Sequence, residues 1–258
     1  MALAKTIMLL LCLVSTGEGA WGALCIMPPR SAASTPRSTT SFLTARTPLP
    51  IVDWRAHGVV TPVMDQGNIG SRWAISAMGA IEGLHKIRTR RLVSLSSQQI
   101  YDCSNKSVVN SHLKAFNWVL HNGGVASEQT YPYVGQEQDC KREKLHMISA
   151  SIRGLVWNIR TELDLLIQVG YQPVTVRMSL DRTSFHNYTG GIFSGPCGND
   201  GHSMLAVGYG ATADGRKYWI VKNSYGIHWG DHGYFYVQRG PNHGPGLCGL
   251  ANYAAYPV

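Results

Sequence analysis

Apolar residues in the first half of the chain recur at the spacing of an α-helix. The clearest stripe follows positions i, i+3, i+4 and i+7 and consists of Ala74, Ala77, Met78 and Ile81. Residues at this spacing share one face of a helix, so the stripe predicts an amphipathic helix that buries this face. Ser71 precedes the stripe and is the candidate N-cap, because its hydroxyl can accept a hydrogen bond from a free N–H of the first turn.

Two further helices are expected in the same half. Ser96 and Gln99 have the spacing of a capping box, in which each side chain bonds the backbone N–H of the other residue. A third helix is predicted by an apolar stripe at Leu113, Phe116 and Leu120. Gly123 would end it, because glycine readily adopts the left-handed conformation that follows a helix.

The second half of the chain changes to short segments with the pattern of strands. Four of them, at 174–178, 205–209, 218–222 and 234–239, are bounded by Gly, Pro or Asp-Gly. A single helix is expected between the two halves, over 161–169. The chain is long enough, at 258 residues, to bury a substantial core.

The N-terminus has the pattern of a secretory signal. Lys5 precedes an apolar run at 7–14 and small residues follow, so we expect a signal peptide at 1–22. The run is shorter than the roughly 20 residues of a membrane-spanning helix, so no membrane anchor is expected. Residues 23–48 are rich in Ser, Thr, Pro and Arg, and we interpret them as a flexible leader or propeptide remnant. The mature protein is then expected to be secreted, or vacuolar or lysosomal by the secretory route.

The net charge of +8 changes this interpretation little. No long run of Lys or Arg appears, so a solvated basic surface explains the charge better than an acidic partner does. Motifs for nucleic acids or phosphates are absent, and no spacing of His, Cys or Asp is typical of a metal site. We expect a monomer with no cofactor, no metal and no nucleic-acid partner.

Several motifs resemble those of the papain family of cysteine peptidases. They occur in the family's order and are VDWR at 52–55, QGNIGSRWAISA at 66–77, GGIFSGPCG at 190–198, GHS at 201–203 and KNSYG at 222–226. The resemblance extends from Ile51 to Val258. It implies an α+β fold, with a helical half at 49–160, an antiparallel β-barrel half at 161–258 and a cleft between them. Such a cleft is where a ligand is expected.

The resemblance also implies a set of site residues. A thiol peptidase needs a nucleophilic thiolate, a His that shuttles protons, a group that orients this His and donors for the oxyanion. His202 matches the family's His, Asn223 its orienting Asn, Gln66 the oxyanion donor and Trp229 the aromatic residue that shields the Asn–His hydrogen bond. The nucleophile position holds Arg72, whose guanidinium neither loses its proton nor attacks a carbonyl.

Other positions depart from the family pattern as well. Val109-Asn110 stands where the family has a Gly-Gly pair, Gly201 where an acid or amide is common, and Tyr225 where a Trp is usual. Ser71 and Ser76 are not expected to replace the nucleophile, since neighbouring helical residues point about 100° apart. We expect His202 to be neutral, because Arg72 would place a second cation beside it.

The resemblance implies two disulfides, Cys103–Cys140 and Cys197–Cys248. A third family bridge would join the position of Ile69 to one near Ser107, and neither residue is a cysteine. Cys25 is then left unpaired or available for an intermolecular bridge. Asn105 and Asn187 begin glycosylation sequons and are candidate sites in a secreted protein.

These observations leave several functions open. The first is a papain-like homologue without proteolytic activity. A second is a module that binds peptides or carboxylates in the cleft, and a third is a storage or defence protein. A residual cysteine-type endopeptidase is the fourth. Expected partners are a peptide or protein in the cleft and cystatin-like inhibitors.

Overall fold

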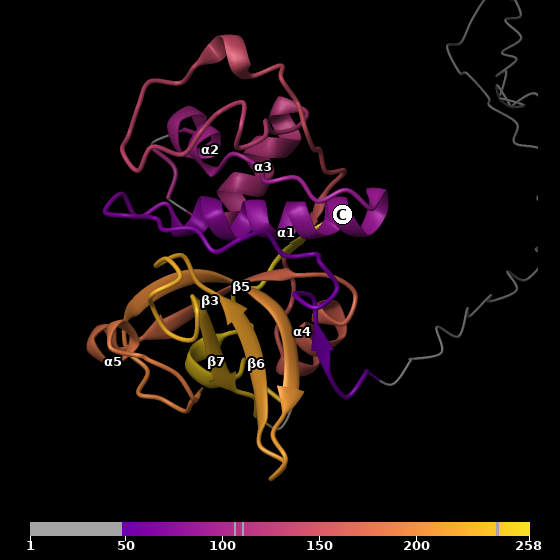
Figure 1. The fold of residues 1–258 in the computed structure, drawn as a ribbon, viewed down its shortest axis with the longest axis vertical. Coiled ribbons are helices and arrows are strands. Elements are labelled where there is room, and N and C mark those ends of the chain that lie inside the picture. Colours follow the sequence, from indigo (N-terminus) through magenta and orange to yellow (C-terminus); the bar gives the residue numbers. More distant parts are fainter. Residues whose placement is uncertain (1–47, 106, 110, 241–242) are drawn as a thin grey trace, which may run out of the picture. The chain divides into compact units, whose positions relative to one another are not determined.

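A computed structural model describes residues 48–105, 107–109, 111–240 and 243–258. The predicted signal peptide, almost all of the predicted leader, and Cys25 lie outside these residues. Residues 47–258 form one compact unit of the α+β class, in which helices lie above a twisted sheet (Figure 1). None of the helices in the described part is long and apolar enough to cross a membrane.

The three predicted helices of the first half are present. They are α1 (Arg72–Thr89), α2 (Ser97–Cys103) and α3 (His112–Asn122). Helix α1 lies between the other two and the sheet, and its first three turns are almost wholly buried (Figure 1). Gly123 ends α3 in the left-handed conformation, with φ of 77°, as predicted.

The two predicted helix starts differ in detail from expectation. Ser71 is the N-cap of α1 by position, but its side chain makes no capping hydrogen bond and instead bonds the Tyr133 hydroxyl at 2.6 Å. Ser96 does cap α2, since its Oγ accepts from the Gln99 backbone N–H at 3.0 Å. The reciprocal half of the capping box is missing, because the Gln99 amide bonds the Lys144 carbonyl and the Ala126 N–H.

All four predicted strands form and belong to one six-stranded sheet. Its strands are β1 (Val52–Asp53), β3 (Val174–Leu180), β4 (Ile192–Phe193), β5 (Asp200–Ala211), β6 (Lys217–Lys222) and β7 (Tyr234–Gln238). The order is β1-β5-β6-β7-β4, and β3 pairs with β5 on the same edge as β1. All pairs are antiparallel except β4 with β7.

The sheet in the half expected to be a β-barrel is not closed within the described strands. Strands β1 and β3 lie on one edge and β4 on the other, and these edges do not pair with each other. Strand β4 consists of only two residues, which gives it too short an edge to close the sheet.

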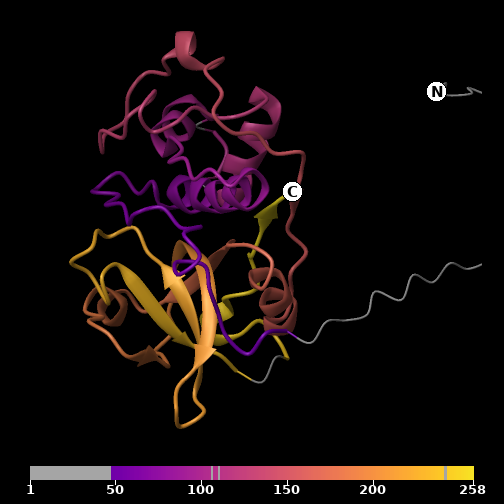
Figure 2. The same ribbon diagram turned by 45° about the vertical axis from the view of Figure 1, so that its right-hand side comes forward.

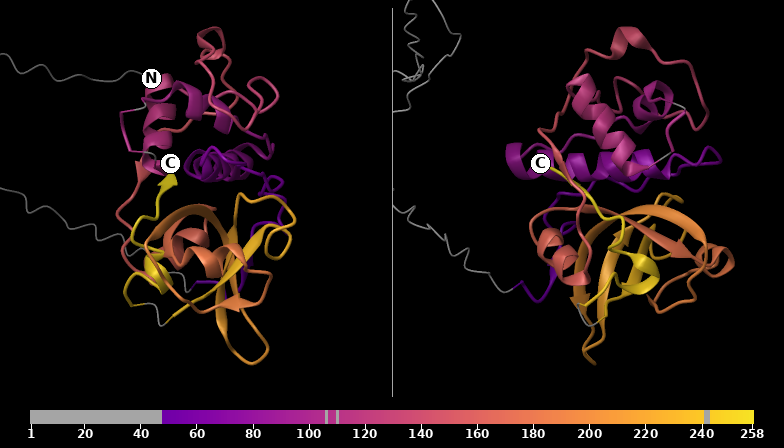
Figure 3. Two further views of the ribbon diagram at one scale, coloured as in Figure 1. Left: turned by 90° about the vertical axis from the view of Figure 1, so that its left-hand side faces the viewer. Right: turned by 180° about the vertical axis from the view of Figure 1, so that it is seen from behind.

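The remaining elements are short helices and one further pair of strands. Helix α4 (Glu162–Val169) is capped by Thr161, and α5 (Arg182–His186) by Asp181. The short strands β2 (Leu155–Val156) and β8 (Tyr256–Pro257) pair with each other, and β8 lies beside α1 (Figures 2 and 3). Two short 3-10 helices are η1 (Arg142–Lys144) and η2 (Leu247–Gly249).

Each end of the unit therefore belongs to the opposite half of the fold. Strand β1, from the first half of the sequence, pairs with β5, whereas β8, from the second half, lies against α1. A hydrophobic core between α1 and the sheet includes Met78, Phe116 and Ile220. A division of the chain between residues 160 and 161 stays a prediction. Strands β1 and β8 each contact elements on the other side of this boundary.

Both disulfides implied by the resemblance are present. Cys103 at the end of α2 is bonded to Cys140, and Cys197 to Cys248 in η2. Each closes a long loop, which restricts the unfolded chain and is worth about 2–4 kcal/mol of stability.

Candidate active site

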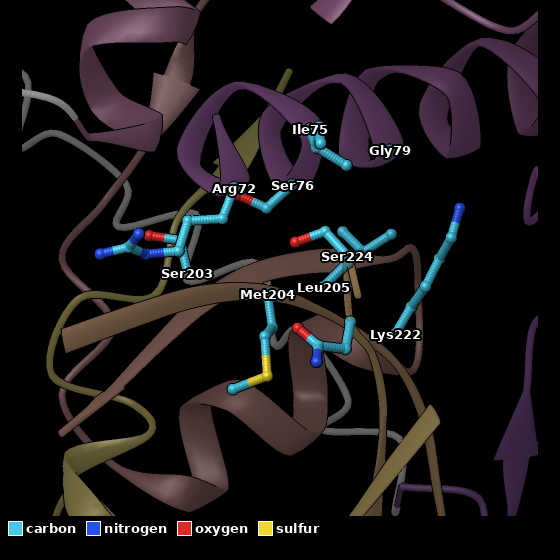
Figure 4. A pocket seen from close by; sticks show the side chains of 10 residues that line it. Arg72, Ile75, Ser76, Gly79, Ser203, Met204, Leu205, Lys222 and Ser224 are labelled. Carbon is cyan, nitrogen blue, oxygen red and sulfur yellow. The ribbon is translucent and has the colours of Figure 1, made fainter. Parts of the chain in front are cut away.

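Three residues that the resemblance assigned to the site lie close together, at the start of α1, near the start of β5 and directly after β6. Arg72 is the first residue of α1, His202 lies near the start of β5, and Asn223 directly follows β6. Strands β5 and β6 are antiparallel neighbours, with Leu205 opposite Lys222. This pairing brings the start of one strand beside the end of the other, below the N-terminus of α1 (Figure 4).

His202 and Asn223 form a buried hydrogen-bonded pair. The His202 Nε2 and the Asn223 Oδ1 are 2.8 Å apart, and the two residues are 3% and 2% exposed. Because an amide oxygen only accepts, Nε2 carries the proton and donates it, which leaves Nδ1 as an acceptor. The Tyr225 hydroxyl donates to this Nδ1 over a long 3.4 Å. The imidazole is thus held in one orientation and one tautomer.

Aromatic rings enclose this pair, although they are not all the expected ones. The His202 ring contacts the rings of Phe185 and Tyr225, each with centroids 4.9 Å apart. Trp229 packs behind them, against Phe185 at 4.9 Å and Tyr225 at 5.6 Å, and makes no ring contact with His202 in the described structure. Phe185, which the sequence analysis did not single out, therefore takes part in the shielding expected of Trp229.

The pKa of His202 is lowered to about 3. Burial is the largest cause, since it penalises the charged ring, and the Arg72 cation is the second. The hydrogen bond to Asn223 acts in the opposite direction. The predicted neutral His202 is thus confirmed, although burial contributes more to it than Arg72 does.

This low pKa gives a direct prediction for the pH dependence of His202. We expect its ring resonances in an NMR titration to stay unchanged between pH 5 and 8. In Arg72→Gln the pKa should rise, because one of the three causes that lower it is removed, but burial should keep it below the usual 6.5. Arg88→Gln, at the far end of α1, is the matched control and should leave the His202 pKa unchanged.

The lowered pKa of His202 also makes the stability of the folded protein depend on pH. Between pH 6.5 and 3 the unfolded chain binds the His202 proton and the folded chain does not, so stability falls as pH falls through this window. The loss from this residue approaches about 1.4 kcal/mol per pH unit. A His202 resonance that titrates near pH 6.5 would contradict both expectations.

Gln66 lies beside this pair in a fixed orientation. Its Oε1 accepts from the Ser224 hydroxyl at 2.8 Å, and its backbone N–H donates to the Ser224 carbonyl at 2.8 Å. With Oε1 held in this way, the amide Nε2 remains as a donor that has no hydrogen-bond partner within the described residues. This is the group that an oxyanion would need.

Arg72, which the resemblance assigns to the nucleophile position, lies at the N-terminus of α1 next to His202. Its Nη2 donates to the Gly201 carbonyl at 3.2 Å, which is the residue before His202. No carboxylate lies within ion-pair distance of this guanidinium among the described residues. The side chain is partly buried and extends away from Lys222 (Figure 4).

Neither neighbouring serine is available as a replacement nucleophile. Ser71 is fully buried and its hydroxyl bonds Tyr133, whereas the Ser76 hydroxyl donates to the Trp73 carbonyl at 3.2 Å. The two hydroxyls are thus engaged in the packing of α1, in agreement with the sequence-based expectation.

The space behind Arg72 is small. A cavity between α1 and strands β5 and β6 has a volume of about 10 Å³, enough for about one water molecule (Figure 4). Its lining includes Arg72, Ser76, Ser203, Lys222 and Asn223. It is therefore a packing gap beneath the site and has no room for a substrate.

The other departures from the family pattern have different surroundings. An added Cβ at Gly201 would collide with the Arg177 guanidinium, so an acid or amide there would require Arg177 to move. Val109 is 79% exposed, and Asn110 lies outside the described residues.

No group of three or more His, Cys, Asp or Glu in the described part could hold a metal ion. Asn105 and Asn187 are exposed, and their glycosylation stays a prediction.

Comparisons with known proteins identify the family. The sequence model described as "Papain family cysteine protease" matches residues 50–258. Vignain from Phaseolus vulgaris is 40% identical over 238 residues, which cover 89% of this chain and 66% of vignain. The KDEL-tailed cysteine endopeptidase CEP2 from Arabidopsis thaliana is 40% identical over 80% of this chain and 59% of its own. The chain thus spans less than two thirds of these relatives.

A solved structure agrees with this assignment. Bromelain from Ananas comosus, in complex with the E64 inhibitor, has 37% sequence identity and a TM-score of 0.76, over 81% of this chain and 99% of its own. The chain belongs to the papain family of cysteine proteases.

Proposed function

We propose that this protein is a papain-family homologue that has lost thiol-peptidase chemistry. The observation that carries the proposal is the guanidinium of Arg72 at the nucleophile position. A guanidinium stays protonated at all relevant pH values and has no lone pair with which to attack a carbonyl carbon. Covalent catalysis by the family's route would therefore lack its first step.

The cysteines of the chain support the same conclusion. Four of the six are paired in disulfides, and a disulfide sulfur is not a thiolate nucleophile. The other two, Cys12 and Cys25, belong to the predicted signal peptide and leader. No free thiol is therefore available among the described residues beside His202.

An assay of the purified protein tests this proposal. We expect no hydrolysis of casein or of fluorogenic peptides, and no covalent labelling within residues 48–258 by an epoxide that alkylates active-site thiols. Cys25→Ser is the control that removes labelling at the remaining thiol of the leader. Turnover that a thiol reagent abolishes would instead support a residual cysteine endopeptidase, the activity for which the relatives are named.

A second candidate function is the binding of a carboxylate by Arg72. It is favoured by the environment of this guanidinium, which donates one N–H to Gly201 and has no carboxylate partner among the described residues. Arginine can bind a carboxylate with two parallel hydrogen bonds, and the Gln66 Nε2 and the N-terminus of α1 would add favourable donors. A peptide that ends in a free carboxylate fits this arrangement.

Paired peptides test this second function. A peptide acid should bind more tightly than the same peptide with a C-terminal amide, and Arg72→Gln should remove that difference. Equal binding of acid and amide by the original protein would reject carboxylate recognition while leaving the loss of thiol chemistry intact.

We also propose that the protein enters the secretory route. The predicted signal at 1–22 supports this, as does the similarity to a KDEL-tailed endopeptidase. Mass spectrometry of the protein from a secretory host should find the N-terminus after about residue 22. A full-length chain retained in the cytosol would reject the proposal.

A further inference from the structure

A basic pocket lies at the end of the sheet remote from α1. It is formed where β4 and β7 end and β6 begins, and its volume is about 250 Å³. Its lining residues are Ile192, Ser194, Arg216, Lys217, Gln238 and Arg239. Three of these six side chains are cations and none is an acid, which distinguishes this pocket from an ordinary mixed surface.

Arg239 is the most unusual of the three cations. It is only 9% exposed, and its guanidinium lies over the rings of Tyr209 and Trp219, at 5.5 and 5.8 Å from their centroids. Its Nε is buried and has no hydrogen-bond partner among the described residues. A buried polar atom without a hydrogen bond is costly, so this N–H favours an acceptor supplied from the pocket.

Glu162, the acid that attracts Arg239, does not act as its ion-pair partner. Glu162 accepts hydrogen bonds from the Trp219 indole N–H at 2.9 Å and from the Gly240 N–H at 2.8 Å, one on each carboxylate oxygen. It attracts Arg239 but forms no ion pair with it within the described residues. Arg239 is thus stabilised by the rings of Tyr209 and Trp219 and by the attraction of the Glu162 carboxylate.

The other two cations differ in their pairing. Arg216 forms an exposed ion pair with Asp214 at 2.8 Å. Lys217 is exposed and has no acidic partner in the described structure. The backbone N–H of Arg239 donates to the Lys217 carbonyl at 2.9 Å, which holds the two residues side by side. Two adjacent cations, Lys217 and Arg239, therefore have no ion-pair partner among the described residues.

The pocket is separate from the candidate active site. Strand β6 runs from Lys217 at the pocket to Lys222, the residue before Asn223. At about 3.3 Å per residue the two sites are roughly 20 Å apart. Figure 1 shows the same separation, since the hairpin between β5 and β6 lies at the end of the sheet away from α1. An anion in the pocket would not contact Arg72 or His202.

We propose that the basic pocket binds a small molecule through a phosphate monoester group, which is close to doubly charged at pH 7. Two adjacent cations that form no ion pair within the described residues match a double negative charge, and the arginine offers N–H groups to oxygen acceptors. The Ser194 hydroxyl and the Gln238 amide supply further donors at the rim, and Ile192 supplies an apolar wall. The inference is independent of the proposed loss of peptidase chemistry.

An NMR titration of the full chain tests this site. Sodium phosphate and sodium sulfate are each added against sodium chloride at constant ionic strength, and the backbone amides of Ser194, Lys217 and Gln238 are followed. We expect saturable shifts for both oxyanions and none for chloride. Lys217→Gln should weaken binding about tenfold, because it removes one charge-assisted hydrogen bond.

Matched variants distinguish binding in the pocket from a general attraction of anions by the net positive charge of the protein. Lys217→Arg keeps the cation and should retain binding, and Arg88→Gln removes an equal charge from the exposed end of α1 and should leave binding unchanged. Shifts that do not saturate would overturn the proposal. So would equal weakening by Lys217→Gln and Arg88→Gln, because that result would indicate attraction by the net charge alone.

Discussion

We expect the Arg72→Cys variant to hydrolyse a fluorogenic peptide that the original protein leaves intact. The substitution places a thiol at the N-terminus of the 18-residue α1, where the helix dipole favours a thiolate. His202 already lies near this position, with its Nε2 bonded to Asn223 and its Nδ1 left as a proton acceptor that only the long bond from the Tyr225 hydroxyl engages. The gain in kcat/KM should be on the order of at least 10²-fold, the usual contribution of a positioned general base.

Two controls define what this gain means. Arg72→Ala also removes the guanidinium but supplies no thiol, so it should remain inactive. Adding His202→Ala to Arg72→Cys should abolish the gain, because the thiol then lacks its proton acceptor. A folded Arg72→Cys protein without activity would contradict the prediction, and it would show that changes beyond residue 72 also block catalysis.

The long elements of this fold could be predicted from the sequence because local patterns determine them. Helices α1 and α3 follow apolar stripes at helical spacing, and strands β3, β5, β6 and β7 follow apolar segments between turn residues. The motifs also singled out His202 and Asn223, which are hydrogen-bonded to each other in the structure. Their catalytic role stays a prediction.

Features that depend on distant residues could not be predicted in this way. Ser71 has the sequence of a helix cap, yet Tyr133, 62 residues away, binds its hydroxyl. Strands β1, β2 and β8 have two residues each and exist only because another strand pairs with them. Phe185 lies on the five-residue helix α5, which is too short for periodicity to reveal, so its contact with His202 was missed.

A buried polar chain joins the helices to the sheet below the candidate site. The Lys222 Nζ donates to the Thr61 carbonyl and hydroxyl, at 2.8 and 3.0 Å, and the Thr61 hydroxyl donates to Glu82 at 2.7 Å. The other Glu82 oxygen accepts from the Leu95 N–H at 2.7 Å. Burial raises the pKa of Glu82 and lowers that of Lys222, and the attraction between the two opposes both shifts.

Lys222→Met should therefore destabilise the protein strongly. Glu82 is 5% exposed and would be left as a buried carboxylate without a cation. Lys222 and Glu82 are linked through Thr61 and form no direct ion pair, so the loss should lie at or below the about 3–5 kcal/mol that removing one member of a buried ion pair typically costs. The loss would be measured as the change in unfolding free energy from urea titrations at pH 7, with wild type and variant compared at equal denaturant slopes.

The double variant Lys222→Met with Glu82→Gln separates charge from packing. If the uncompensated carboxylate causes the loss, neutralising it should restore part of the stability, so the two changes would be far from additive. The loss in Lys222→Met should also shrink as pH falls toward 4.5, the ordinary pKa of the carboxyl, because the folded state then holds Glu82 in its neutral form. Additive effects at pH 7 and a loss that does not change with pH would instead assign the cost to the missing lysine stem, and Glu82 would have no part in it.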